Sequence, residues 1–263
     1  MRAGLGVRLF ACLVALLFVA PTLIVAATSV TSGSMVTFPP KGFSPRWFQE
    51  VLTDPEWLTA LGNSVQVGLL AAVLAMAAGT SLAFAAARSR FLPPALVTGL
   101  AVLPMTVPLV VAGIGFYLVY VRVGLSGNAL SLGIAHAVLG LPFVFVNVLA
   151  ALTGVDRRVE EAARVSGATE TVTLVRITLP LVAPAALVGG VLAFVSSWDE
   201  VVVALFLNTP RFRTLPVVMW SQVRSGVEPS ISAVATLITL VSLLMAALVL
   251  VGPAVVKKVR RRT

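Results

Sequence analysis

The chain has few charged residues: Asp, Glu, Lys and Arg make up 11% of its 263 residues, against about 25% in an ordinary soluble domain. Hydrophobic residues make up 59%, and the mean hydropathy is +1.03. This balance excludes a soluble globular protein and predicts an integral membrane protein. The length leaves room for one membrane domain, residues 1–263, and for no large soluble appendage.

Cysteine and histidine are almost absent. The single Cys12 has no partner for an intrachain disulfide. The single His136 has no second His or Cys nearby, so we expect a packing or polar-contact role for it and no metal site. The sequence contains no Gly-rich phosphate loop with its Lys, no nucleophile elbow and no zinc-protease signature. It therefore predicts that the chain is not an enzyme and that any ATP driving it is bound by another chain.

Long apolar runs dominate the sequence instead. A helix needs about 20 apolar residues to cross a bilayer, and six segments predict transmembrane helices at about residues 9–30, 61–87, 95–121, 130–152, 181–207 and 231–256. An alternative interpretation of the first is a signal peptide, since Arg2 and Arg8 precede it, but its uncharged stretch is long for one. Prolines that can kink or break these helices stand at Pro104, Pro108, Pro142, Pro180 and Pro184.

The net charge of +9 would suit a nucleic-acid-binding protein, but the basic residues stand between the apolar segments and at the C-terminus. Such residues are topology signals, because cytoplasmic loops of membrane proteins carry an excess of Lys and Arg. With the N-terminus inside, most of the 19 basic residues fall on the cytoplasmic side. The sequence therefore predicts that both termini, and the loop at about residues 153–180, face the cytoplasm.

The longest predicted outside loop covers about residues 31–60. Ser44-Pro45 and Asp54-Pro55 each put a capping side chain before a proline suited to a first helical turn. Aromatic residues are interleaved there at Phe43, Trp47, Phe48 and Trp57. This pattern predicts short helices at the membrane interface, with contact to a partner on the outer face as the alternative.

The predicted cytoplasmic loop begins with a short amphipathic helix at about residues 156–166. Its small residues recur at helical spacing on one face, at Val159, Ala162, Ala163 and Ser166. Opposite charges four residues apart predict two ion pairs, Arg157 with Glu161 and Glu160 with Arg164. Gly167 is placed to end this helix in a left-handed turn. A second helix, at about residues 169–179, then runs into the fifth span with Pro180 at the junction.

The same stretch carries a recognisable motif: Glu161-Ala162-Ala163, then Gly167, then Ile177, Leu179 and Pro180. This spacing resembles the EAA loop of permease subunits in bacterial ATP-binding cassette (ABC) importers. The resemblance implies that Glu161, Ala162, Ala163 and Gly167 sit in a cleft of a separate cytoplasmic ATPase. In that role Glu161 makes the polar contact, the two alanines allow close approach, and Gly167 makes the turn.

Two carboxylates, Asp199 and Glu200, stand in the otherwise apolar fifth span. Carboxylates at membrane depth usually face a bundle interior or an aqueous cavity. Adjacent helix residues differ by about 100° in direction, so we expect only one to point into a pathway. One interpretation is a binding point for a cationic solute, with Trp198 offering an aromatic face to an ammonium group. The alternative is structural salt bridges at the outer mouth, with Arg122, Arg211 or Arg213.

The residues around this pair narrow the resemblance. Ser197-Trp198-Asp199-Glu200 and the apolar run after it resemble the corresponding segment of spermidine/putrescine permeases. Further matching stretches are Asn63-Ser64, Ala135-His136, Leu141-Pro142-Phe143, 214–220 and 228–233. The resemblance covers nearly the whole chain, most strongly residues 63–254. Weaker candidates for the solute pathway, each expected instead in packing or at the interface, are Tyr117, Asn147 and Trp220.

This resemblance implies an all-α integral membrane protein with six transmembrane helices and the fold of type I ABC importer permeases, in the bacterial inner membrane. Two copies of a cytoplasmic ATPase, holding ATP and Mg, would drive alternating access. The other implied partners are a second, related permease subunit and an extracytoplasmic binding protein. The acidic pair favours a polyamine, although similar permeases carry opines, aminoethylphosphonate, thiamine or ferric iron. Hypotheses from other classes are an ATP-independent channel or carrier and a membrane scaffold.

Overall fold

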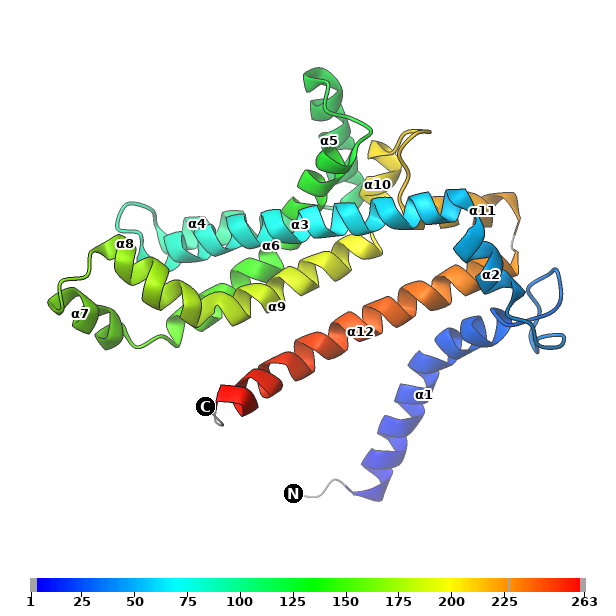
Figure 1. The fold of residues 1–263 in the computed structure, drawn as a ribbon, viewed down its shortest axis with the longest axis horizontal. Coiled ribbons are helices and arrows are strands. Elements are labelled where there is room, and N and C mark those ends of the chain that lie inside the picture. Colours follow the sequence, from blue (N-terminus) through cyan, green and yellow to red (C-terminus); the bar gives the residue numbers. More distant parts are fainter. Residues whose placement is uncertain (1–3, 227, 261–263) are drawn as a thin grey trace. The chain divides into compact units, whose positions relative to one another are not determined.

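The computed structural model describes residues 4–226 and 228–260, and for residues 248–260 it describes the backbone alone. The fold is all-α (Figure 1), as predicted; within the described residues the one extended pairing is the isolated bridge between Thr209 and Phe212. The helices are α1 (Leu5–Thr28), α2 (Arg46–Thr53), α3 (Pro55–Arg88), α4 (Pro94–Val102), η1 (Leu103–Met105), α5 (Leu109–Val123), α6 (Ala129–Thr153), α7 (Arg157–Val165), α8 (Glu170–Thr173), η2 (Leu174–Thr178), α9 (Leu179–Trp198), α10 (Val202–Leu207), α11 (Leu215–Ser225) and α12 (Pro229–Arg260).

Among the residues that the structure describes, five stretches are long and apolar enough to cross a membrane, and the number becomes six if the bent pair of α4 and α5 forms one span. The five are α1, α3, α6, the continuous helical run Glu170–Trp198 and Pro229–Ala247 of α12. The chain divides into two compact units. One is formed by Met1–Ala60 with Val218–Leu243, and the other by Leu61–Val217 with Leu244–Thr263.

In the first unit, the segment between α1 and α2 folds around the fully buried Thr31. The Thr31 hydroxyl accepts the backbone N–H groups of Gly33 and Lys41, each at 3.2 Å. Its carbonyl accepts the indole N–H of Trp47 at 3.0 Å, and the Arg46 guanidinium lies 4.3 Å from the centre of the Trp47 ring. Part of the predicted outside loop is therefore an ordered segment with its own polar centre.

Both helix starts predicted in this loop are confirmed. The N–H of Arg46 at the start of α2 donates to the Ser44 hydroxyl at 3.2 Å. The Asp54 carboxylate accepts the N–H of Glu56 at 2.7 Å, in the first turn of α3. However, α3 is not a short interfacial helix. It continues for 34 residues and includes the predicted second span, because residues 56–64 contain no proline that would end it.

In the second unit, α6 and α9 pack along each other through glycines. A Cβ added at Gly189 of α9 would lie 2.5 Å from the Cα of Val144 on α6, and one added at Gly140 of α6 would lie 2.7 Å from the Cβ of Ala193 on α9. Both distances are too short for a side chain, so the two helices approach this closely because glycine stands at both points. Small residues serve this purpose between helices in lipid.

We expect Gly189→Ala to destabilise the folded protein. The added methyl group would force apart backbones in contact, at a cost of about 2 kcal/mol, which lowers the midpoint of thermal unfolding by about 5 °C in a chain of this length. The matched control is Gly99→Ala in α4, where an added Cβ meets nothing within 4 Å. Thermal unfolding of the detergent-solubilised variants measures the difference, and equal midpoints would contradict the close packing.

The predicted third span is two helices, α4 and α5, which meet at a bend of 98°. Pro104 lies in the short helix η1 between them, and Pro108 directly precedes α5. A proline has no N–H to donate and its ring prevents the preceding turn from continuing as α-helix. Of the five prolines expected to kink or break their helices, Pro104 and Pro108 break this one, whereas Pro142 lies inside α6. Helix α5 packs against α10, where Gly113 faces the ring of Phe206.

The predicted fifth span, residues 181–207, is likewise divided. Helix α9 ends at Trp198, and α10 begins at Val202. Proline is not the cause here, because Pro184 lies inside α9 without ending it. The interruption falls at residues 199–201, which include the acidic pair.

Candidate functional site

The segment with the EAA spacing, residues 156–180 (the EAA segment), begins with α7. The Asp156 carboxylate caps this helix by accepting the N–H of Arg158 at 2.9 Å. Helix α7 ends at Val165, within one residue of the prediction. An aspartate at this position satisfies an N–H that has no partner inside the helix and complements the positive end of its dipole.

Gly167 ends α7 in the predicted left-handed turn, with φ of 89°. The N–H of Gly167 donates to the carbonyl of Arg164 at 2.9 Å, and the N–H of Ala168 donates to the carbonyl of Ala163 at 3.0 Å. These two bonds form the Schellman pattern, which satisfies the last carbonyls of a helix and fixes the direction of the chain beyond it.

The second predicted helix starts after Thr169, whose hydroxyl accepts a backbone N–H of α8 at 3.3 Å. The helix contains a five-residue π-helical part, η2, which the sequence did not indicate; there the N–H of Leu179 reaches back five residues, to the carbonyl of Leu174. The ring of Pro180 crowds the carbonyl four residues before it, which favours a widened turn at this place. The helix thus continues through Pro180 into α9 without a break.

The motif residues divide by exposure. Five of the motif residues are exposed: Glu161, Ala162, Gly167, Leu179 and Pro180. The other two, Ala163 and Ile177, are half-buried. Two apolar residues of α7 are also uncovered, Val165 at 90% and Val159 at 47% exposure. Val165 and Glu161 are four positions apart and so lie on the same side of α7, whereas Val159 points about 120° away from Val165.

Glu160, the neighbour of the motif glutamate, is buried, with 8% exposure. Its Oε1 accepts one hydrogen bond from the guanidinium of Arg88 and one from the hydroxyl of Thr178, both at 2.8 Å. The sequence suggested Arg164 as its partner. The ion pair instead reaches the end of α3, 72 residues away in the chain, and sequence spacing within one helix could not reveal it. The available signal was that two adjacent glutamates on a helix differ in direction by about 100°.

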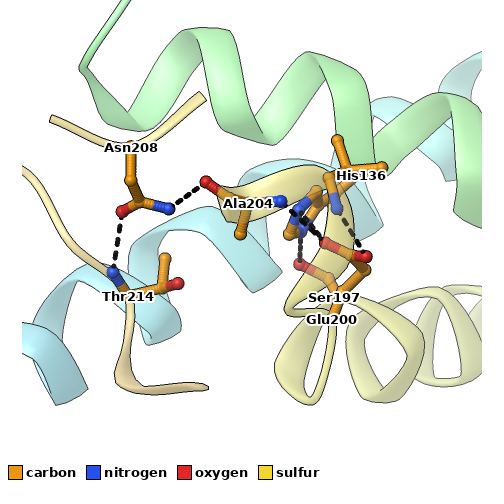
Figure 2. A network of polar contacts seen from close by, with 7 residues as sticks. His136, Ser197, Glu200, Ala204, Asn208 and Thr214 are labelled. Atoms are coloured by element: carbon orange, nitrogen blue, oxygen red, sulfur yellow. Dashed lines mark hydrogen bonds and ion pairs between the residues drawn. The ribbon is translucent and has the colours of Figure 1, made fainter. Parts of the chain in front are cut away.

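Glu200 lies in a polar network at the break between α9 and α10 (Figure 2). Its carboxylate accepts the N–H groups of Val203 at 2.9 Å and Ala204 at 3.0 Å, and so caps α10. One carboxylate oxygen lies 3.3 Å from Nε2 of His136 on α6, whose Nδ1 is 2.7 Å from the Ser197 hydroxyl. The exposed fractions are 9% for Glu200 and 2% for His136. Glu200 thus explains the helix break, and His136 has the expected polar-contact role.

Asp199 is exposed, unlike its neighbours on either side. Trp198 is 3% exposed and stacks on Phe194, with ring centroids 5.7 Å apart and an interplanar angle of 19°. Of the three predicted pathway residues, Asp199 is therefore the one that presents its side chain at the helix break. Glu200 and Trp198 are occupied by contacts within the chain.

Several residues that carried the resemblance hold the loop after α10. The side-chain amide of Asn63 donates to the backbone carbonyl of Arg213 at 2.9 Å. The N–H of Leu215 donates to the Ser64 hydroxyl at 2.8 Å, and the N–H of Thr214 donates to the side-chain oxygen Oδ1 of Asn208 at 3.2 Å. The Asn208 amide in turn donates to the carbonyl of Ala204 (Figure 2). These contacts tie residues 208–215 to α10 and α3.

The weaker pathway candidates have separate surroundings. The Asn147 amide donates to the carbonyl of Phe143 in its own helix at 2.8 Å. Tyr117 of α5 and Trp220 of α11 are each 47% exposed. The Asn147 contact is local to α6, in keeping with the expected packing role.

The sequence matches known membrane transport proteins over most of its length. The family described as "Binding-protein-dependent transport system inner membrane component" matches residues 75–261. The spermidine/putrescine transport system permease protein PotC of Haemophilus influenzae is 35% identical over 218 residues, covering 83% of this chain and 84% of that protein. The putrescine transport system permease protein PotI of Escherichia coli is 34% identical over 226 residues, covering 83% and 80%.

Solved structures of low sequence identity share the fold. A bacterial ABC transporter that imports the acidic polysaccharide alginate has a chain with a TM-score of 0.71 and 21% identity, covering 98% of this chain and 99% of that one. The alginate transporter in complex with its pentasaccharide-bound periplasmic protein gives a TM-score of 0.66 at 16% identity, covering 94% and 91%. The predicted fold class, that of ABC importer permeases, is thereby confirmed. The family match, the two permease relatives and the shared fold agree, and the chain belongs to the inner membrane components of binding-protein-dependent transport systems.

Proposed function

We propose that this chain is a permease subunit of an ABC importer that carries spermidine, putrescine or a closely related polyamine across the bacterial inner membrane. The observation that carries the substrate class is the identity of 34–35% to permeases named for these two polyamines. The exposed carboxylate of Asp199 beside a break in a membrane helix supports it, because polyamines are cations and attract an anionic side chain in a low-dielectric setting.

The structure of the EAA segment supports the proposal that a separate ATPase drives transport. Helix α7 is capped at Asp156, turned at Gly167 and joined through an unbroken helical run to α9. Its outer surface carries Glu161, Ala162 and the uncovered Val165. In the proposed complex this surface seats in a cleft of the ATPase, with Ala162 allowing close approach and Glu161 making the polar contact.

The remaining parts of the transporter follow from this role. Two copies of the ATPase hold ATP and Mg, and this chain holds no cofactor of its own. A second permease subunit, a different but related chain, pairs with this one around the pathway. An extracytoplasmic binding protein delivers the solute, in keeping with the family's dependence on binding proteins. Both termini and the EAA segment lie in the cytoplasm, as the distribution of basic residues favours.

The proposed mechanism is alternating access. The loaded binding protein docks on the outer face, and ATP closes the ATPase dimer on the inner face. The EAA segment passes that closure to α9, whose far end lies next to Asp199. The polyamine then leaves its binding protein, passes Asp199 at the interface between the two permease subunits and enters the cytoplasm.

The experiment that tests the substrate class is uptake of labelled spermidine and putrescine, in cells carrying or lacking this gene, with the partner subunits present. We expect gene-dependent uptake that unlabelled polyamine competes away. No difference, with the ATPase still copurifying, would contradict the polyamine and direct the search to opines, aminoethylphosphonate, thiamine and ferric iron. Uptake by this chain alone without ATP would instead favour a channel or carrier.

A further inference from the structure

Two adjacent glutamates of α7 have opposite surroundings. Glu161 is exposed, and Glu160 is 8% exposed. Neighbouring helix positions point about 100° apart, so a helix that presents one residue to a partner turns the other towards its own protein. The motif residue and its neighbour therefore have different tasks.

One oxygen atom of Glu160 connects three helical elements: α7, which carries it, α3 and η2. Oε1 accepts the Arg88 guanidinium, from the last residue of α3, and the Thr178 hydroxyl, from the last residue of η2, both at 2.8 Å. Thr178 is 2% exposed, and the side chains of Glu160 and Arg88 are 11% and 25% exposed, so the carboxylate is buried and the guanidinium is only partly so. Burying a carboxylate is unfavourable unless charge-assisted hydrogen bonds compensate it, and the two donors supply them.

Such a contact tolerates little movement. Both hydrogen bonds are at their normal length and depend on direction, so a shift of α7 of about 1 Å relative to α3 or α9 would weaken both. Separating Glu160 from Arg88 would also leave a charge in a poorly hydrated place. It is therefore less costly for α7 to carry the ends of α3 and α9 with it than to slide past them.

We propose that Glu160 is the positioning residue that transmits movement of α7 into the membrane helices α3 and α9, while the neighbouring Glu161 serves to hold the ATPase. This inference rests on the proposed function as an ATPase-driven permease. It assigns docking and transmission to two adjacent residues of one helix, so the two are separable by mutation.

The test uses the complete importer, purified with its partner subunits and reconstituted in liposomes. Three quantities are measured: the ATPase that copurifies, ATP hydrolysis, and spermidine taken up per ATP hydrolysed. For Glu160→Ala we expect a normal amount of ATPase and uptake per ATP lower by about ten-fold. For the matched variant Glu161→Ala, one residue away, we expect loss of the copurifying ATPase.

Two further variants separate transmission from folding. Glu160→Gln keeps the shape of the side chain and an acceptor for Thr178 but removes the charge that holds Arg88. We expect it to lower uptake per ATP by about three-fold. If Glu160→Ala fails to insert, this variant tests the role of Glu160 in transmission in its place. The exchange Arg88→Glu with Glu160→Arg restores the ion pair in reverse, and we expect it to recover most of the uptake lost in Glu160→Ala. A purely local loss of stability would not be rescued in this way.

A distance measurement gives a readout that needs no solute. Spin labels at Arg157→Cys on α7 and Leu187→Cys on α9, in a background with Cys12→Ser, report whether the two helices move together when ATP binds. We expect an unchanged separation with Glu160 present and a change of several ångströms in Glu160→Ala.

Two results for Glu160→Ala would overturn the inference. Parallel loss of ATPase and uptake would place Glu160 in the docking surface, and an unchanged uptake per ATP would show that it transmits nothing. Absence of ATPase and uptake from the unmodified complex would contradict the proposed function itself.

Discussion

Gly167→Pro is expected to reduce the ATPase that copurifies with this chain by at least about 30-fold, which corresponds to about 2 kcal/mol of binding free energy. The φ of residue 167 is 89°, and proline holds φ near −65°. The proline would also remove the N–H that donates to the carbonyl of Arg164. The chain beyond α7 would then leave in another direction, and the docking surface would lose its shape. Affinity purification from membranes, with the ATPase quantified, measures this.

The matched control is Gly167→Asn, because asparagine tolerates the left-handed conformation better than other residues with a side chain. We expect it to retain most of the ATPase, with membrane abundance equal in both variants. Glu161→Lys reverses the charge of the exposed carboxylate without altering the turn, and should also lose the ATPase. A Gly167→Pro protein that inserts normally and carries the usual amount of ATPase would show that the turn is not needed for docking.

Asp199→Asn is expected to lower polyamine uptake by at least about ten-fold without changing the amount of protein in the membrane, since the loss of a charged contact to a cation is worth about 2 kcal/mol. Asp199 is exposed at the break between α9 and α10. The kinetics of labelled spermidine uptake, at matched abundance, measure the effect. Unchanged kinetics would remove Asp199 from the pathway.

Glu200→Ala serves as the contrasting variant one residue away. It would leave two backbone N–H groups of α10 without their acceptor and remove the carboxylate that lies 3.3 Å from the buried imidazole of His136, at a cost of about 3 kcal/mol. We expect a midpoint of thermal unfolding lower by about 8 °C and a lower membrane abundance. If Asp199→Asn with Glu200→Gln were tolerated in both uptake and abundance, a membrane scaffold would become the better hypothesis.

Local signals in the sequence were sufficient for the elements whose structure depends on nearby residues. The start of α7 at Asp156, its left-handed end at Gly167 and the break of the third span near Pro104 and Pro108 follow from capping, glycine and proline chemistry within a few residues. The second helix of the EAA segment follows similarly from Thr169. The bounds of α7, the turn at Gly167 and the start of the second helix were predicted at or within one residue of their places, whereas the third span was predicted as one segment that its prolines could kink or break.

The features that sequence analysis missed depend on contacts between distant segments. The ion pair of Glu160 with Arg88 and the close contact of Glu200 with His136 each bring together residues that are 64 or more positions apart in the chain. The end of α9 at Trp198 could not be foreseen either, because no proline or glycine marks it; the carboxylate of Glu200 makes the break by capping a new helix. Spacing along one helix carries no information on such partners.

The π-helical segment η2 also affects how this chain must be compared with its relatives. An α-helix turns about 100° per residue, and a π turn accommodates one extra residue. The number of residues between Gly167 and Pro180 is therefore matched to a widened turn at residues 174–178. A relative that has an ordinary α-helix there would need one residue fewer to present the same faces. Counting positions from the glycine alone would then pair Thr178 with a residue that points about 100° away from it, and the structural register must be used instead.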